Sequence, residues 1–260
     1  MTFHIWEGVY PSFADAPGKV SVTGEGDGGF EGSQWLEKSV RRAVEARDRM
    51  RSPRTIKPAA LARDYVLPVV AALAHSGDRP LSVLDFGGGL AISYFGAEAA
   101  LPAGRSLVFH CLESEALRRE ASALFTDYPD LHFHSEFATV PKPVDVVHAG
   151  SSLQYVEDWR GVLGLLCGFA PRYLVLADIP ASDLETFVSI QNYYERHIRH
   201  WFWNIGEFVA AVEANGYQLL YRSNYQGVYL GREGPYPMDN FPPERQLGHS
   251  CQMVFRKIGA

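Results

Sequence analysis

Cysteine is scarce in this chain of 260 residues, and its three copies, Cys111, Cys167 and Cys251, lie far apart in apolar segments. No pair has the Cys-x-x-Cys spacing, so the sequence predicts neither a zinc site nor a disulfide framework. An excess of positive charge is also missing. The formal net charge is −6, which argues against general affinity for the phosphates of nucleic acids.

Long apolar runs are absent as well. No stretch reaches the roughly 18 apolar residues that a membrane span needs, and no secretory signal opens the chain. We therefore expect a cytoplasmic protein with no membrane span and no nucleic-acid partner, while its oligomeric state stays open. The apolar content of 47 % predicts a well-buried core.

The first 78 residues differ in character from the rest. Residues 1–33 mix aromatic residues with glycine and proline, and two helical patterns follow, over Ser33–Met50 and Ala59–His75. We predict an N-terminal cap over residues 1–78 and a larger domain over residues 79–260, with a hinge at residues 77–80. The aromatic segment is either a lid over a site or a packing element.

From residue 80 onward, strand and helix patterns alternate, which is typical of a doubly wound α/β sheet. Only a loop rich in proline and glycine separates the last two strands, so we expect them to pair antiparallel. The predicted fold is Rossmann-like, with a mostly parallel seven-stranded sheet, one antiparallel C-terminal strand and the N-terminal cap. The predicted strands are Leu81–Leu84, Leu107–Leu112, Leu131–His134, Val144–Ala149, Tyr173–Ala177, Tyr217–Arg222 and Cys251–Arg256. The predicted helices include Glu115–Thr126, Trp159–Phe169, a long aromatic helix over Asp183–Trp203, and Gly206–Asn215.

A glycine turn follows the first strand of this sheet. The order is a short apolar strand, Asp85, the three glycines Gly87, Gly88 and Gly89, and then a segment with helical spacing. Glycines remove side chains where backbone must approach a ligand. The dinucleotide spacing Gly-x-Gly-x-x-Gly/Ala fails because Ile92 falls at its last position, and no Gly-Lys-Ser/Thr follows to make a phosphate-binding loop.

What stands there is Asp-x-Gly-x-Gly-x-Ala, from Asp85 to Ala91. This motif resembles the first motif of the class I S-adenosylmethionine-dependent methyltransferases, and the likeness of the sheet extends over roughly residues 80–258. The resemblance implies S-adenosyl-L-methionine as cofactor, bound at Asp85 and the three glycines. The alternative is a glycine-rich turn in another kind of α/β protein.

Further cofactor residues follow from the same resemblance. Glu113 ends the second strand, where a carboxylate accepts hydrogen bonds from a ribose diol, and Glu115 is its local rival. Glu136 and Phe137 match the positions near the adenine ring, although a solvated acid and a core phenylalanine are the simpler interpretation. The fourth strand ends at Gly150 and Ser151, at the sheet edge where ligands of α/β proteins collect.

Acceptor contacts are expected beyond that strand. Gln154 and Tyr155 are the candidates directly after it, while His148 within the strand is interpreted as a core histidine. In the predicted aromatic helix, Tyr193, His197 and His200 share one face and Tyr194 and Trp201 lie on the next. One of the two histidines, preferably His200, is the candidate general base for a hydroxyl acceptor. A plain aromatic packing stripe is the alternative, and no metal site is expected.

The function that follows is methyl transfer from S-adenosylmethionine to a small polar acceptor. The segment Trp6-Glu-Gly-Val-Tyr-Pro-Ser-Phe resembles that of little-characterised bacterial methyltransferase-like proteins often associated with surface-polysaccharide genes. This likeness implies a sugar hydroxyl as acceptor. Two alternatives stay open: another nucleotide- or nucleotide-sugar-acting enzyme such as a dehydrogenase, and a non-catalytic partner subunit.

Overall fold

The computed structural model describes residues 3–17, 33–51, 66–75, 79–193 and 196–259. Its centre is a seven-stranded sheet in the order β10-β13-β6-β5-β2-β3-β4. Six strands run parallel and β13, between β6 and β10, runs against them. The strands are β2 (Leu81–Phe86), β3 (Leu107–Leu112), β4 (Leu131–His134), β5 (Val146–Gly150), β6 (Tyr173–Ile179), β10 (Tyr217–Asn224) and β13 (Cys251–Lys257). The predicted mostly parallel sheet with one reversed C-terminal strand is confirmed.

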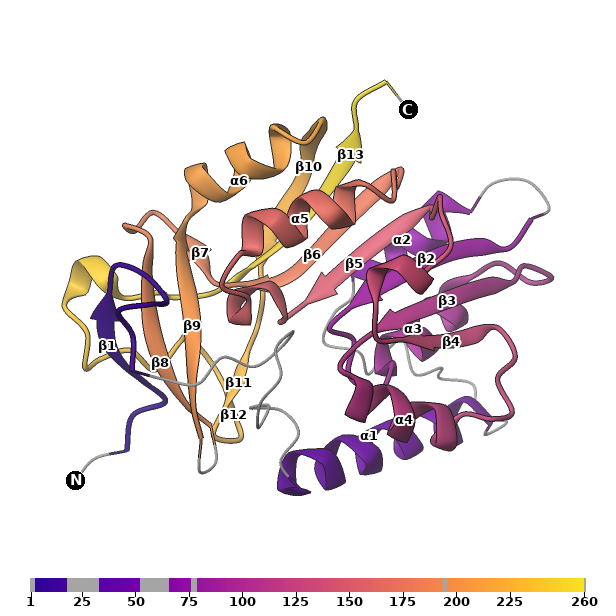
Figure 1. Cartoon of the computed structure of the whole chain (residues 1–260), viewed down its shortest axis with the longest axis horizontal. Helices are drawn as coiled ribbons and strands as arrows, with labels where there is room; N and C mark the ends of the chain where they lie inside the picture. Colours follow the sequence, from indigo (N-terminus) through magenta and orange to yellow (C-terminus); the bar gives the residue numbers. More distant parts are fainter. Residues whose placement is uncertain (1–2, 18–32, 52–65, 76–78, 194–195, 260) are drawn as a thin grey trace.

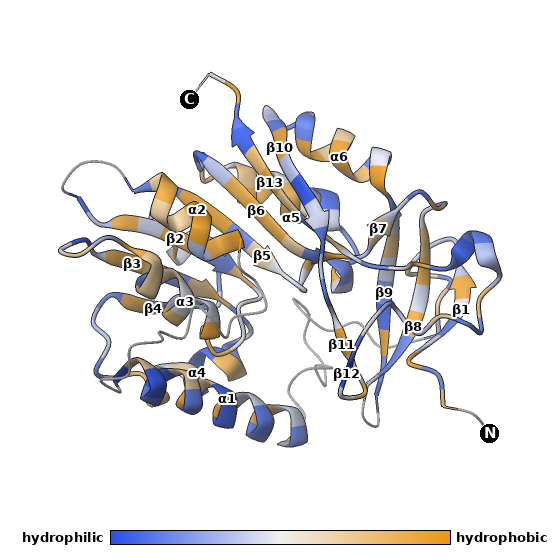
Figure 2. Cartoon of the chain, turned by 180° about the vertical axis from the view of Figure 1, so that it is seen from behind, coloured by the Kyte–Doolittle hydropathy of each residue, from blue (hydrophilic) through white to orange (hydrophobic). Residues whose placement is uncertain are grey.

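Helices cover both faces of this sheet (Figure 1). Two buried clusters correspond to the two faces, because one takes its helical residues from α1, α2, α3 and α4, and the other from α5 and α6. The helix α2 is apolar along its whole length, as Figure 2 shows, and packs on α3 and on β6. The helices are α1 (Ser33–Arg51), α2 (Val66–Ala74), α3 (Ile92–Ala100), α4 (Glu115–Leu124), α5 (Trp159–Cys167) and α6 (Ile205–Glu213). None of them is long and apolar enough to cross a membrane, as far as the chain is described.

A second, smaller sheet stands beside the carboxyl ends of the central strands (Figure 1). Its order is β1-β8-β9-β7, and β8 and β9 form an antiparallel hairpin. Its strands are β1 (Trp6–Tyr10), β7 (Ala181–Ser182), β8 (Phe187–Tyr193) and β9 (Arg196–Asn204). A two-stranded ribbon of β11 (Val228–Tyr229) and β12 (Arg232–Glu233) lies in the loop between β10 and β13.

The predicted helix over Asp183–Trp203 is therefore wrong. The side chains of Ile198, His200 and Phe202 are buried while Arg199 and Trp201 between them are only partly so, which is the period of two of a strand. The segment is also rich in β-branched and aromatic residues, which fit a pleated surface better than a helix.

The first 78 residues contribute to two parts of the fold. The strand β1 pairs with β8 in the small sheet, whereas α1 and α2 pack against α3 beside the central sheet. The predicted boundary at residue 78 and the first two residues of the predicted hinge, 77 and 78, lie outside the described residues. The division into a cap and a larger domain stays a prediction.

Three histidines are neighbours on β3 and β4, and through them the free energy of unfolding depends on pH in the acidic range. Nδ1 of His110 lies 3.1 Å from Nε2 of His134, and the ring of His110 stacks on that of His132 at 5.2 Å. Burial, and then the two neighbouring histidines, lower the pKa of His110 from 6.5 to about 4.

In the unfolded chain, His110 therefore binds a proton below about pH 6.5. In the folded chain it binds that proton only below about pH 4. Stability should be constant above pH 6.5 and fall between pH 6.5 and 4. For His110→Gln we expect the slope of the unfolding free energy against pH in that window to decrease by up to one proton, about 1.4 kcal/mol per pH unit. Urea unfolding at several pH values measures it. An unchanged slope would contradict the assignment, and His4→Gln, outside the histidine cluster, is the control.

Candidate functional site

A cavity of about 980 Å³ lies between the carboxyl ends of the central strands and the small sheet. Its floor comes from the turns after β2, β3, β5 and β6, and its far wall from β1, β8, β9 and the β11–β12 ribbon. The helix α1 contributes Trp35, Lys38, Ser39 and Arg42 to the near rim. Polar groups thus converge on an aromatic-lined hollow at the sheet edge where α/β proteins bind ligands.

The glycine turn forms one side of this cavity. Gly87 and Gly89 have φ angles of +68° and +59°, which side-chain-bearing residues rarely adopt. A Cβ on Gly87 would lie 2.4 Å from Cβ of Ser152, and a Cβ on Gly88 would lie 2.3 Å from Oδ2 of Asp85. The close approach and the backbone conformation together explain the run of glycines.

Asp85 supports this turn from below. It is 1 % exposed, accepts a hydrogen bond from Nδ1 of His148 at 2.7 Å, and accepts another from the Ser93 hydroxyl. Its side chain does not line the large cavity. It borders a smaller hollow of about 220 Å³ on the other side of the turn. The predicted role of Asp85 in cofactor binding stays a prediction, since its side chain is hydrogen-bonded to His148 and Ser93.

Glu113 lies at the carboxyl end of β3 and lines the cavity. Its Oε1 accepts a hydrogen bond from the Gly89 N–H at 2.8 Å, and its Oε2 accepts one from the Ser114 N–H at 3.0 Å. The two backbone donors fix the carboxylate beside the glycine turn. A carboxylate accepts hydrogen bonds through both oxygens, which suits the two hydroxyls of a ribose.

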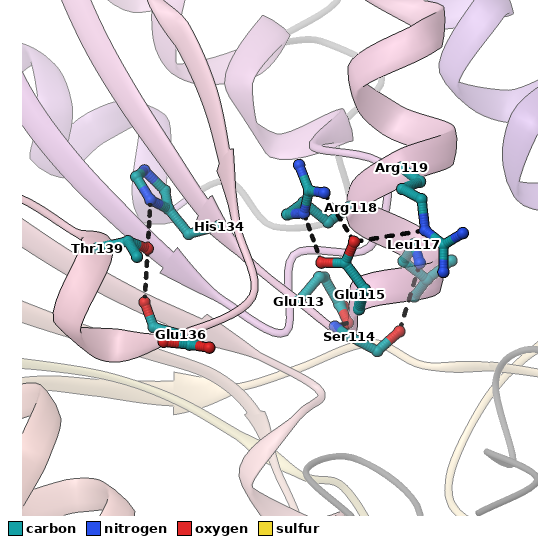
Figure 3. A network of polar contacts seen from close by, with 9 residues as sticks. All are labelled: Glu113, Ser114, Glu115, Leu117, Arg118, Arg119, His134, Glu136 and Thr139. Carbon is teal, nitrogen blue, oxygen red and sulfur yellow. Dashed lines mark hydrogen bonds and ion pairs between the residues drawn. The ribbon is translucent and has the colours of Figure 1, made fainter. Parts of the chain in front are cut away.

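The rival carboxylate, Glu115, points elsewhere. It lies on the exposed first turn of α4 and forms ion pairs with Arg118 and Arg119, as Figure 3 shows. The hydrogen-bonded guanidinium of Arg118 is the main reason why the pKa of Glu115 falls to about 2. Glu115 is not among the described residues that line the cavity.

The two residues expected near the adenine stand apart from the cavity. Glu136 is exposed at the start of a short 3₁₀ turn, where its carbonyl accepts a hydrogen bond from the Thr139 hydroxyl (Figure 3). Phe137 packs between Phe86 and Phe169, with ring centroids 5.8 and 6.3 Å away. Neither is among the described residues of the cavity wall.

The turn after β5 brings four predicted residues to the cavity. Gly150, Ser151, Gln154 and Tyr155 all line it. Nε2 of Gln154 lies 3.2 Å from the Ser151 hydroxyl, while its Oε1 is buried without a hydrogen-bond partner. Ser151 has a φ of +55°, so the backbone turns sharply there.

The hairpin sends one of the two candidate histidines inward and the other outward. His200 is buried, lines the cavity and lies edge-on to Tyr155 and Trp6, with ring centroids 5.3 and 5.8 Å away. Burial lowers the pKa of His200 to about 3. His197 is exposed at the hairpin end, and its Nδ1 lies 2.7 Å from Oδ1 of Asn192.

Of the other predicted hairpin residues, one lines the cavity and one does not. Tyr193 lines the cavity. Trp201 is not among the described wall residues, because its ring packs on Phe13 and its Nε1 donates to the Val156 carbonyl at 3.0 Å. Tyr194 lies outside the described residues. No group of three histidine, cysteine or acidic residues in the described chain could hold a metal ion.

Several residues of the wall were not predicted. Asp178 comes from the end of β6, Trp6 from β1, Gln191 from β8, and Tyr229 and Tyr236 from the last long loop. Trp6 stacks on Tyr236 with ring centroids 4.7 Å apart. The sequence offered one signal only, the aromatic richness of residues 3–13 and 225–241, which does not say where those segments pack.

Comparison with known proteins finds likeness only at the level of structure. No protein-family model matches the chain, and no curated protein matches it in sequence. Magnesium protoporphyrin IX methyltransferase from Synechocystis PCC 6803 with bound SAM is 14 % identical, with a TM-score of 0.49 over 90 % of this chain and 87 % of that chain. The 1,6-didemethyltoxoflavin-N1-methyltransferase of Burkholderia thailandensis is 13 % identical, with a TM-score of 0.48 over 95 % and 99 %. The CcbJ methyltransferase of Streptomyces caelestis is 14 % identical, with a TM-score of 0.47 over 82 % and 95 %. At such identities the acceptors of these enzymes say nothing about the acceptor of this chain.

Proposed function

We propose that this protein transfers a methyl group from S-adenosylmethionine to a small polar acceptor, a sugar hydroxyl. The observation that carries the cofactor half is Glu113, fixed by the N–H groups of Gly89 and Ser114 at the rim of the glycine turn. Ribose hydroxyls would donate to Glu113. The rest of the cofactor would lie along Gly87 and Gly88, where an added Cβ has no room.

The far wall supports the acceptor half of the proposal. It presents aromatic rings and buried polar atoms together, which suits a ligand with apolar faces and several hydroxyls, as a sugar has. Buried polar groups normally have hydrogen-bond partners, and a concentration of unpaired ones calls for a ligand. Among the described residues, the buried atoms without a partner are Trp6 Nε1, Gln191 Oε1 and His200 Nδ1 on the far wall, and Ser152 Oγ and Gln154 Oε1 on the adjoining floor.

In such a mechanism the chain mainly positions the acceptor against the methyl group and excludes water from the site. The cofactor supplies a methyl group that is already activated by its positive sulfur. Tyr155 and Tyr193 would border the acceptor, and Gln154 would orient one of its hydroxyls. His200 is neutral at ordinary pH because burial lowers its pKa to about 3. It would therefore serve as a hydrogen-bonding contact more readily than as the base, since a base must end as a buried cation.

Glu113 and Glu115, the two carboxylates that follow β3, provide a test of the proposed cofactor binding. We expect Glu113→Gln to weaken S-adenosylhomocysteine binding by roughly tenfold to a hundredfold, since hydrogen bonds to a charged group contribute about 1.5–3 kcal/mol. Glu115→Gln is the matched control, two residues away on the exposed helix, and should leave the affinity unchanged. Isothermal titration calorimetry measures both, and equal effects of the two variants would contradict the site.

The alternatives are separated by ligand choice. Thermal shifts with S-adenosylhomocysteine, NAD and a nucleotide-sugar distinguish a methyltransferase from another nucleotide-acting enzyme. Transfer of a labelled methyl group to methyl glycosides of glucose, galactose, mannose and rhamnose then tests the acceptor. Tight cofactor binding without transfer to any acceptor, including amines and phenols, would instead favour a partner subunit.

A further inference from the structure

Asp178, near the carboxyl end of β6, is held in an unusual position. Its φ is +51°, a left-handed conformation that costs free energy in a residue with a side chain. The Ser250 hydroxyl donates to its Oδ1 at 2.5 Å, and the Tyr236 hydroxyl lies 3.4 Å from the same oxygen. Ser250 immediately precedes β13, so a contact between distant parts of the chain fixes this carboxylate. Backbone strain maintained in this way is typical of functional sites.

The place of Asp178 on the sheet edge matters more than its strain. The strands β3, β2, β5 and β6 are consecutive neighbours, and at their carboxyl ends stand Glu113, the glycine turn, Gly150 and Asp178 respectively. Gly150 pairs with Ala177, and the Ser151 N–H donates to the Ala177 carbonyl at 3.0 Å. Asp178 is therefore next to Ser151, about three strand spacings, or roughly 14 Å, from the end of β3.

This order fixes which part of the cofactor would meet Asp178. With the ribose on Glu113 and the rest of the cofactor along the glycine turn, the positive sulfur would lie farther along the edge, towards β5 and β6. Asp178 lines both the large cavity and the smaller hollow behind the turn. Among the described residues that line the large cavity, Glu113 and Asp178 are the two carboxylates. Because Glu113 is committed to the ribose, Asp178 is the carboxylate that remains for the reacting end.

The groups around Asp178 fit a charged reaction centre. Tyr155 and Tyr229 line the cavity beside it, and burial followed by the charge of Asp178 raises the pKa of both phenols. Tyr236 and Ser250 face it from the loop before β13. The cations among the described cavity residues, Lys38 and Arg42, are on α1 at the opposite rim. Electron-rich rings and one carboxylate favour a positive group.

We propose that Asp178 pairs with the positive sulfur of the cofactor and takes the proton of the acceptor hydroxyl, an inference that rests on the proposed function. The acceptor oxygen forms a bond to the methyl carbon, and the electron pair of the broken carbon–sulfur bond stays on sulfur. The hydroxyl proton goes to the carboxylate of Asp178. A positive sulfonium and a negative carboxylate become a neutral thioether and a neutral acid, so the step leaves no new charge at the reacting atoms. With His200 as the base, a buried imidazolium would remain instead.

The charge pairing is tested without knowing the acceptor. Sinefungin is an analogue of S-adenosylhomocysteine that carries an amine, protonated at neutral pH, in place of the transferable methyl group. We expect Asp178→Asn to weaken binding of sinefungin by roughly tenfold or more and binding of S-adenosylhomocysteine by less than about twofold. Glu113→Gln is the matched control and should weaken both by the same factor, because both carry the ribose. Equal losses of the two ligands in Asp178→Asn, or none, would overturn the pairing.

The proton transfer is tested with the methyl glycosides named above, in single turnovers of the full chain with labelled S-adenosylmethionine. Asp178→Asn should lower the rate by about a hundredfold to ten-thousandfold, and Asp178→Glu should recover part of it. His200→Asn keeps a neutral hydrogen-bonding group and should lose far less. The reverse order of the two variants would assign the proton to His200. If the wild-type protein does not bind S-adenosylhomocysteine at all, the proposed function itself is contradicted. Failure of the proposed function is thereby distinguishable from failure of the role of Asp178.

Discussion

Gly87→Val is expected to lower the affinity for S-adenosylhomocysteine by about a hundredfold or more. The backbone at Gly87 has a φ of +68°, and its Cβ would lie 2.4 Å from Cβ of Ser152. The branched side chain would strain the turn by about 1–3 kcal/mol and occupy the path of the cofactor. A loss of about 2.7 kcal/mol already corresponds to a hundredfold change in affinity.

Gly104→Val is the matched control for this experiment. Gly104 has a φ of +78°, nothing lies within 4 Å of its Cβ position, and it is outside the described cavity wall. Its valine variant suffers backbone strain of the same kind, so its stability should fall while its cofactor affinity is kept. Calorimetry measures affinity, and circular dichroism confirms that both variants are folded. If Gly87→Val binds S-adenosylhomocysteine as well as Gly104→Val does, the glycine turn is not the cofactor site.

Asp85→Ala is expected to destabilise the fold more than the loss of any surface carboxylate. Its carboxylate accepts hydrogen bonds from the buried ring of His148 and from the partly buried hydroxyl of Ser93, and both bonds would be lost. Two hydrogen bonds to a buried carboxylate contribute about 3–5 kcal/mol together. For a chain of this size, that loss lowers the melting temperature by roughly 6–20 °C.

Asp145→Ala supplies the comparison for Asp85→Ala. Asp145 pairs with Arg79, whose side chain is 63 % exposed, and accepts the Ser82 N–H at 2.9 Å. An exposed ion pair contributes about 0–1 kcal/mol, so the melting temperature should fall by a few degrees at most. The double variant Asp85→Ala/His148→Phe should lose less than the sum of the two single variants, because the two side chains act together. Additive losses would show that Asp85 and His148 act independently.

The central sheet could be predicted from sequence because each strand is a short apolar run bounded by turn residues. Leu107–Leu112 and Leu131–His134 match the structure residue for residue. Glu113 could be identified for a related reason, since a carboxylate directly after a strand must lie at the sheet edge. The placement of such residues depends on local pattern and on the general geometry of parallel sheets.

The far wall of the cavity and the position of Asp178 could not be predicted in the same way. In the hairpin, the spacing of Tyr193, His197 and His200 fits a helix face as well as the alternation fits a strand, and the pairing of β8 with β1 settles the choice. Asp178 follows Leu-Val-Leu-Ala and looks like any strand end. Its importance rests on Ser250, 72 positions later, and such a contact has no local signature.

The strand β1 has a consequence for how the chain is made. Glu7 accepts a hydrogen bond from the Ser189 hydroxyl across 182 positions, and Trp6 packs among Phe202 and Tyr236. At about 5–20 residues per second, a ribosome needs roughly 10–40 s to reach Ser189 after Glu7. Throughout that interval the aromatic N-terminal segment has no sheet to join, although β2 to β6 can already assemble. The residues of β1 are thus synthesised long before they can be buried, and they stay open to chaperones and proteases until β8 has been made.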